Sequence, residues 1–300
     1  MIRLCFPSSP GAIIPPRPRR HRHNTATPFP SIPPRSRSLH QHRLTPLLAS
    51  SRGDRRQRVG GPDMVLFTVT KKATTPFEGQ KPGTSGLRKK VTVFQQPNYL
   101  HNFVQATFNA LPAEQVKGAT IVVSGDGRYF SKDAVQIITK MAAANGVRRV
   151  WVGQHSLMST PAVSCVIRDR VGADGSKATG AFILTASHNP GGPTEVDISV
   201  LLVSLASAGP EGPFDVDVFD SSVDYIKLMK SIFDFEAIKK LLTSPKFTFC
   251  YDALHGVAGA YAKRIFVEEL GADESSLLNC VPKEDFGGGH PDPNLTYAKN

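Results

Sequence analysis

The stretch Ala119-Thr120-Ile121-Val122-Val123-Ser124-Gly125-Asp126-Gly127 decides the fold of this 300-residue chain. Its first five residues are apolar or β-branched and predict a buried strand, and the next four predict a turn. Ser131 then has the chemistry of a helix N-cap. The helix is predicted to end at Asn145-Gly146, and its apolar face is formed by Ala134, Val135, Ile138, Met141 and Ala142.

The same alternation of strand and helix continues toward the C-terminus. Residues 150–152 predict a second strand, residues 161–170 a helix, and residues 181–184 a third strand. This order predicts an α/β fold in which a doubly wound sheet is covered by helices on both faces, an α/β/α sandwich. Chemistry in such sheets lies in loops beyond the carboxyl ends of the strands, and Thr185–Pro190 occupy such a loop.

A Gly/Pro-rich stretch at residues 209–213 marks a boundary, and a second, incomplete α/β unit is expected after it. Its predicted elements are helices at 223–233, 235–242 and 258–270 and strands at 247–251 and 277–281. The expected organisation is therefore an N-terminal extension (1–63), a first α/β domain (64–213) and a shorter second one (214–300).

The N-terminal extension carries almost all of the chain's formal charge of +11. Residues 1–63 contain twelve Arg, two Asp, eleven Pro and neither Lys nor Glu, so they cannot bury enough surface to fold and are expected to be disordered. This composition is typical of an organelle transit peptide. The alternative is a translated upstream extension without a role, with the natural start at Met64 and Val65–Thr70 opening the domain as a strand.

The composition also argues against two classes of binding partner, nucleic acid and membranes. The basic residues of the extension are not interleaved with aromatic residues, which argues against nucleic acid. No apolar run approaches the length of a membrane span, which argues against a membrane. Cys165 and Cys250 lie in apolar runs without metal-ligand spacing, so both are expected to be reduced core residues.

Ser187 is the strongest candidate for a functional residue. It follows a predicted strand, where converging backbone N–H groups could hold a phosphate on its hydroxyl, and His188 and Asn189 offer further donors. Taken as bare chemistry, a serine in a Gly/Pro-rich loop is more often a capping residue.

The complete string Thr-Ala-Ser-His-Asn-Pro-Gly-Gly-Pro at 185–193 resembles the phosphoserine signature of the α-D-phosphohexomutases. Gly83-Thr84-Ser85-Gly86-Leu87-Arg88 resembles that family's N-terminal motif that contacts the phosphosugar, and Gly125–Phe130 resembles its first βα loop. The likeness extends over residues 64–300 and is greatest for the phosphoglucomutases of the plant cytosol. It implies a phosphohexomutase domain I followed by part of domain II.

The resemblance also implies roles for single residues. Ser187 is expected to be the catalytic phosphoserine, whose phosphate also ligates Mg²⁺. Arg88, Thr84, Ser85 and His188 are expected to bind the substrate, and the planar fork of arginine suits phosphate oxygens. Asp126 and Arg128 fit two interpretations equally well, an ion pair of the site or a turn beside a surface arginine.

The implied activity is the interconversion of glucose 1-phosphate and glucose 6-phosphate through a glucose 1,6-bisphosphate intermediate, with Mg²⁺ as cofactor and the bisphosphate as activator. The implied protein is a cytoplasmic monomer that binds a sugar phosphate. A plastid is the alternative location if residues 1–63 are a transit peptide, and a preference for glucose over mannose stays open.

The chain departs from the family pattern in two places. After Glu195 it continues with a segment that resembles a later part of the family, so one strand is expected to be missing, with an unpaired sheet edge beside the serine loop. The chain also stops at Asn300, before the family's aspartate-rich metal loop, so aspartate ligands for Mg²⁺ are expected to be absent. Two alternatives to an active mutase follow, an inactive fragment or interaction protein and, through the basic extension, a nucleic-acid binder.

Overall fold

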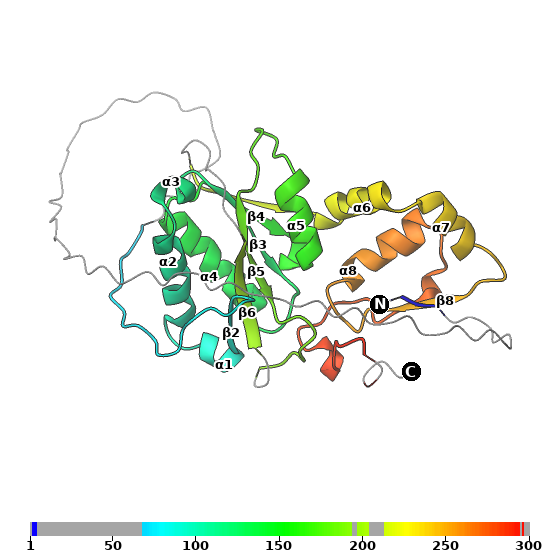
Figure 1. Cartoon of the computed structure of the whole chain (residues 1–300), viewed down its shortest axis with the longest axis horizontal. Coiled ribbons are helices and arrows are strands. Elements are labelled where there is room, and N and C mark those ends of the chain that lie inside the picture. The colour runs from blue at the N-terminus through cyan, green and yellow to red at the C-terminus, as the bar shows by residue number, and fades with distance from the viewer. Residues whose placement is uncertain (1, 5–67, 194–196, 204–212, 295, 297–300) are drawn as a thin grey trace, which may run out of the picture. The chain divides into compact units, whose positions relative to one another are not determined.

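The computed structural model describes residues 2–4, 68–193, 197–203, 213–294 and 296 (Figure 1). The strands are β1 (Ile2–Leu4), β2 (Leu87–Lys90), β3 (Thr120–Gly125), β4 (Arg149–Gly153), β5 (Gly180–Thr185), β6 (Asp197–Val203), β7 (Asp215–Phe219), β8 (Phe249–Asp252) and β9 (Leu277–Leu278). The α-helices are α1 (Val91–Phe94), α2 (Tyr99–Ala110), α3 (Ala113–Val116), α4 (Ser131–Ala144), α5 (Thr160–Asp169), α6 (Ser221–Ile232), α7 (Phe235–Leu242) and α8 (Gly259–Ala262). The remaining helical segments are the 3₁₀ turns η1 (Gln154–Ser156), η3 (Glu274–Ser276) and η4 (Phe286–Gly288) and the π-helix η2 (Lys263–Glu269).

The main sheet has six strands in the order β2-β6-β5-β3-β4-β7. Its centre is parallel, because β3 pairs in parallel with β4 and β5, and β4 with β7. β6 runs antiparallel to both β5 and β2. Parallel strands need crossover connections, and here helices provide them. The predicted α/β class is therefore confirmed.

Alternate residues of the central strands face two separate cores. Ile121, Val123 and Phe182 point to the face covered by α2 and α4. Val122, Trp151 and Ile183 point to the opposite face, where α5 packs. Figure 1 shows these helices on either side of the sheet. Strands buried on both faces explain the continuous apolar runs in the sequence and confirm the three-layer sandwich.

The sheet edge beside β5 is paired, which corrects the expectation of an unpaired edge. Residues 197–203 form β6, which aligns Thr185 with Ser199 on one side and Ser199 with Arg88 on the other. The segment Asp197-Ile198-Ser199-Val200-Leu201-Leu202-Val203 is rich in residues that favour strands, so it can occupy this position even where it departs from the family pattern.

Helix α4 begins one residue earlier than its sequence suggests. Ser131 is the first helical residue rather than the N-cap, and Phe130 is the cap, with a left-handed φ of 69° and no side-chain hydrogen bond to the helix. The Ser131 hydroxyl is buried without a hydrogen-bond partner among the described residues. The predicted N-cap was wrong because a turn closed by a hydrogen bond from Ser131 N to Arg128 O, at 3.0 Å, places Phe130 at the cap position.

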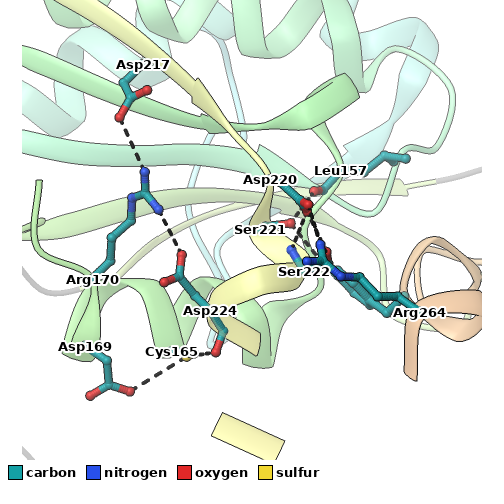
Figure 2. A network of polar contacts seen from close by, with 11 residues as sticks. Leu157, Cys165, Asp169, Arg170, Asp217, Asp220, Ser221, Ser222, Asp224 and Arg264 are labelled. Atoms are coloured by element: carbon teal, nitrogen blue, oxygen red, sulfur yellow. Dashed lines mark hydrogen bonds and ion pairs between the residues drawn. The ribbon is translucent and has the colours of Figure 1, made fainter. Parts of the chain in front are cut away.

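β7, which belongs to the main sheet, and α6, which follows it, connect the sheet to the C-terminal elements. β7 lies beyond the expected boundary and still pairs with β4. Arg170 connects these elements, because its guanidinium lies 3.0 Å from Asp224 and 3.6 Å from Asp217 (Figure 2). The guanidinium also lies 3.8 Å from the ring centroid of Phe219. Figure 2 also shows Arg264 of η2, which donates to Asp220 and Ser222 at the start of α6 and so connects these two elements.

The C-terminal elements surround a small sheet of order β1-β8-β9. The helix expected at 258–270 is α8 followed by the π-helix η2, and the strand expected at 277–281 is only two residues long. The strand expected at 247–251 starts at Phe249. Among the described helices, none combines the length and apolar character needed to cross a membrane.

Three predictions fall partly or wholly outside the described residues. Of the extension expected to be disordered, the structure describes only β1, a strand that the sequence did not suggest. Of the strand suggested for residues 65–70, only 68–70 are described, and they form no strand. The Gly/Pro-rich boundary at 209–213 is described only at its last residue.

The two cysteines expected in the core have different environments. Cys165 on α5 is 1 % exposed, as predicted. Cys250 on β8 is exposed, so the expectation for it was wrong. Successive residues of a strand face opposite sides, and Cys250 lies opposite its buried neighbour Tyr251.

Candidate active site

Ser187 lies on a turn directly after β5, at the carboxyl edge of the main sheet. Its side chain is exposed, and its φ of 57° is in the left-handed region that non-glycine residues rarely adopt. The backbone N–H of Ser187 donates to Thr185 Oγ1 at 3.0 Å, and that of Asn189 donates to Ala186 O at 3.1 Å. These two amides are therefore engaged within the loop and do not belong to the phosphate-binding nest expected around the serine.

His188 is the side chain in contact with the Ser187 hydroxyl. Its Nδ1 lies 3.1 Å from Ser187 Oγ, a hydrogen-bond distance whose donor depends on the imidazole tautomer. His188 is itself exposed. The pair can therefore exchange a proton with each other or with a bound molecule.

Asp126 and Arg128 form a buried ion pair behind the serine loop. Asp126 follows β3, and its backbone N–H donates to Leu184 O at 3.0 Å. Arg128 Nη2 lies 2.8 Å from Asp126 Oδ2, and the two side chains are 1 % and 11 % exposed. Thr185 Oγ1 donates to Asp126 Oδ2 at 2.7 Å. Of the two interpretations left open by the sequence, the structure supports the ion pair of the site.

The register of the sheet brings Arg88 to the same edge as the serine loop. Arg88 on β2 pairs with Ser199 on β6, which pairs with Thr185 on β5. Two strand spacings separate the Cα atoms of Arg88 and Thr185, roughly 10 Å. The exposed Arg88 side chain therefore starts from the edge that carries Ser187.

Thr84 and Ser85 form the tip of a tight turn that leads into β2. Gly83 N donates to Gly86 O at 2.8 Å, and Gly86 N donates back to Gly83 O at 3.2 Å. Gly86 has a φ of 82°, which favours glycine at this position. Thr84 also lines a hollow of about 430 Å³ against α2. The turn places both exposed side chains just before the strand that carries Arg88.

A segment far along the chain, residues 284–286, packs against the turn before α4 and against Gly191 of the serine loop. Tyr129 N donates to Glu284 O at 3.0 Å, and Lys132 on α4 binds Glu284 Oε1 at 2.8 Å. That hydrogen bond raises the pKa of Lys132. Phe286 is buried, and its ring lies under the Arg128 guanidinium, 5.2 Å from its centroid.

Sequence reasoning assigned no role to Thr185 or Phe286. A signal existed for Thr185, because neighbouring parallel strands end together and Asp126 follows β3 as Thr185 ends β5. For Phe286 no local signal existed, since its partner Arg128 lies more than 150 residues earlier.

A complete metal site is not formed by the residues of the structure. Within the described part of the chain, no group of three or more His, Cys, Asp or Glu side chains is placed to hold a metal ion. The residues present therefore do not fit a Mg²⁺ site on their own.

Comparison with known proteins identifies the class. Residues 79–203 match the family described as phosphoglucomutase/phosphomannomutase, alpha/beta/alpha domain I. The structure also resembles that of the Paramecium exocytosis-sensitive phosphoprotein pp63/parafusin, a phosphoglucomutase in its open form. The TM-score is 0.69 at 43 % identity, over 76 % of this chain and 48 % of that one.

Sequence relatives agree with this class. The chain is 79 % identical to phosphoglucomutase, cytoplasmic 2, of Zea mays and 69 % identical to probable phosphoglucomutase, cytoplasmic 2, of Arabidopsis thaliana. Each match covers 79 % of this chain and 47 % of the relative, so the chain spans about half the length of these relatives. The chain belongs to the α-D-phosphohexomutase family, as its serine motif suggested.

Proposed function

We propose that the protein is a phosphoglucomutase that interconverts glucose 1-phosphate and glucose 6-phosphate, with Ser187 as the residue that carries the phosphoryl group. One observation carries this proposal: an exposed serine hydroxyl stands on a left-handed turn whose backbone is held from behind by a buried ion pair. The names of the relatives support it and favour it over an inactive form of the protein.

The chemistry is a pair of phosphoryl transfers. Phosphorylated Ser187 gives its phosphoryl group to the free hydroxyl of the sugar phosphate, the bond from phosphorus to Ser187 Oγ breaks, and glucose 1,6-bisphosphate forms. Ser187 Oγ then bonds to the phosphorus of the other phosphate group and loses its proton. The bond from that phosphorus to the sugar oxygen breaks, and the sugar oxygen takes up a proton, which leaves the other glucose monophosphate. Such transfers depend mainly on positioning and on stabilising charge, so the groups around Ser187 matter as much as the hydroxyl itself.

The neighbours of Ser187 have distinct parts in this proposal. His188 Nδ1, 3.1 Å from Ser187 Oγ, is placed to take or return the hydroxyl proton. Arg88, on the row of Thr185, supplies a planar cation for phosphate oxygens of the substrate. Thr84 and Ser85 on the preceding turn offer hydroxyl groups to the same substrate.

The family resemblance implies Mg²⁺ and glucose 1,6-bisphosphate as cofactor and activator. Among the described residues, no three His, Cys, Asp or Glu side chains are grouped to hold that metal, and the ligand that the resemblance assigns to this chain is the phosphate on Ser187. The transfer steps above are therefore written without the metal.

The proposal also covers the location, the binding partner and the oligomeric state of the protein. The names of the relatives support a cytoplasmic location. A sugar phosphate as the partner, rather than nucleic acid or a membrane, agrees with the near balance of charge over residues 64–300. A monomeric state rests on the family resemblance.

Labelling of Ser187 tests the proposal directly. The purified protein is incubated with glucose 1,6-bisphosphate and Mg²⁺, Ser187 is examined by peptide mass spectrometry, and glucose 6-phosphate formation from glucose 1-phosphate is followed in a coupled assay. We expect a phosphoryl group on Ser187 and a loss of turnover of at least ~10³-fold in Ser187→Ala, because the variant lacks the atom that bonds phosphorus.

Ser231→Ala is the matched control, because Ser231 is an exposed serine on α6 that donates only to Leu228 O. This variant should keep wild-type labelling and turnover. A folded protein in which Ser187 stays unmodified, or a Ser187→Ala variant with wild-type turnover, would overturn the proposal.

A further inference from the structure

Arg128 is a buried cation whose hydrogen bonds go in two directions. Toward its own loop, Nε and Nη2 donate to the Asp126 carboxylate at 2.8 to 3.1 Å. Toward the serine loop, Nη2 donates to Ser187 O at 3.1 Å and Nη1 donates to Asn189 O at 3.3 Å. The guanidinium therefore bridges a fixed carboxylate and two carbonyls of the loop that carries the reactive serine.

Burial makes this bridge rigid. The residue is 2 % exposed, and a charge removed from water is stable only when it is paired and hydrogen-bonded. Asp126 provides the opposite charge, the two carbonyls accept remaining N–H groups, and the ring of Phe286 covers one face of the guanidinium. A guanidinium that moved away would lose these partners while it stayed buried, and this cost holds the arginine and its partners together.

The bridge acts on the backbone on both sides of His188. The carbonyls of Ser187 and Asn189 are bound to one planar group, which constrains the peptide planes between them. The N–H of Ser187 is bound to Thr185 Oγ1, which itself donates to Asp126. Both ends of the Ser187 backbone are thus anchored to the same ion pair, and this keeps the residue at its left-handed φ of 57°.

We propose that Arg128 is a positioning residue for Ser187: through the carbonyls of Ser187 and Asn189 it fixes the direction of the serine hydroxyl toward the phosphoryl group. This inference rests on the proposed function. A role limited to stability would predict that loss of the bridge lowers the melting temperature but leaves the reactivity of each folded molecule unchanged.

Arg128→Lys separates these two roles, because an ammonium keeps the charge but cannot reproduce the planar fork that reaches Asp126 and both carbonyls. The rate of Ser187 phosphorylation by glucose 1,6-bisphosphate is measured together with its dependence on the bisphosphate concentration. We expect the rate at saturation to fall about 10- to 100-fold while the half-saturating concentration changes less than about 3-fold, since misplacing a reacting group lowers the rate of the chemical step.

Arg170→Lys is the matched control. Arg170 is another largely buried arginine, and its two carboxylate partners belong to β7 and α6 (Figure 2). The rings of Phe219 on β7 and Trp151 on β4 lie against its guanidinium, and none of these partners belongs to the serine loop. Arg170→Lys should lower the melting temperature without changing the phosphorylation rate of the folded protein. Hydrogen exchange of the peptide covering residues 185–193 should become faster in Arg128→Lys and stay unchanged in Arg170→Lys.

Thr185→Val provides a second route if Arg128→Lys fails to fold, because it removes only the hydroxyl between Asp126 and the Ser187 N–H. We expect a smaller loss of rate, about 3- to 10-fold. Wild-type phosphorylation rates and wild-type exchange of residues 185–193 in the folded variants would overturn the inference. If wild-type protein itself is never phosphorylated, the proposed function fails, while the exchange measurement still decides whether Arg128 holds the loop.

Discussion

Gly191 offers a direct test of the contact between the serine loop and the segment 284–286. A methyl group at this position would lie 2.5 Å from Glu284 O and 2.9 Å from Phe286 Cδ2. Ordinary contact starts at 3.4 Å, so Gly191→Ala requires the two segments to separate by about 0.9 Å. The φ of Gly191 is not positive, so the cost comes from the clash and not from the backbone.

The expected magnitude follows from two opposing effects. Overpacking of a rigid contact costs about 1–3 kcal/mol, while replacing glycine with alanine stabilises by about 0.4–1 kcal/mol through the unfolded chain. Gly289→Ala shares the second effect but meets only Phe286 O at 3.4 Å and is exposed. The free energy of unfolding should therefore be lower in Gly191→Ala than in Gly289→Ala by about 1–3 kcal/mol, a difference of about 2–12 °C in melting temperature.

The assay combines thermal unfolding with hydrogen exchange of the peptides covering residues 185–193 and 284–286. Gly191→Ala should melt below Gly289→Ala and exchange faster in both peptides, because their contact is lost on both sides. If the two variants melt together and exchange alike, residues 284–286 do not pack on the serine loop and the reasoning is refuted.

Two further predictions concern the side chains drawn in Figure 2. Burial acts to raise the pKa of Asp220, but hydrogen bonds from Ser222 and the ion pair with Arg264 outweigh burial and lower the pKa overall. The ionised carboxylate therefore stabilises the fold fully at pH values above the pKa that Asp220 has in the unfolded chain. This stabilisation is lost as the pH falls through the lower pKa of the folded protein. Asp220→Asn should therefore melt below wild type at pH 7, with a gap that narrows below about pH 4, and a constant gap in thermal scans across that range would count against the ion pair. Burial raises the pKa of Cys165 to about 11, so iodoacetamide at pH 8 should label Cys250 well before Cys165 in the native protein, and equal labelling by peptide mapping would contradict the described burial.

The central strands and their helices could be predicted because each carries its own signal. Residues 119–123 and 181–184 are apolar or β-branched throughout, and the helix at residues 131–144 has a clear apolar stripe. The place of β6 between β2 and β5 could not be predicted, because it depends on which strand reaches the free side of β5 and not on the residues of β6 alone.

The candidate site also contains residues that the sequence could predict and residues that it could not. Ser187 was predicted from its motif, and the sheet register places Arg88 near it, which agrees with the roles expected for both residues without testing them. The importance of Arg128 could not be decided in advance, because a Gly-Asp-Gly-Arg turn has the same local pattern whether its arginine faces water or a loop 59 residues away.

The geometry of Ser187 depends on sheet register as much as on its own loop. β3 and β5 pair from Ile121 with Gly180 to Gly125 with Leu184, and this register places Thr185 beside Asp126. A slip of one residue would turn Thr185 to the other face and break both of its hydrogen bonds. Changes within the β3–β5 pair should therefore reach the serine hydroxyl even when they touch no residue of the loop.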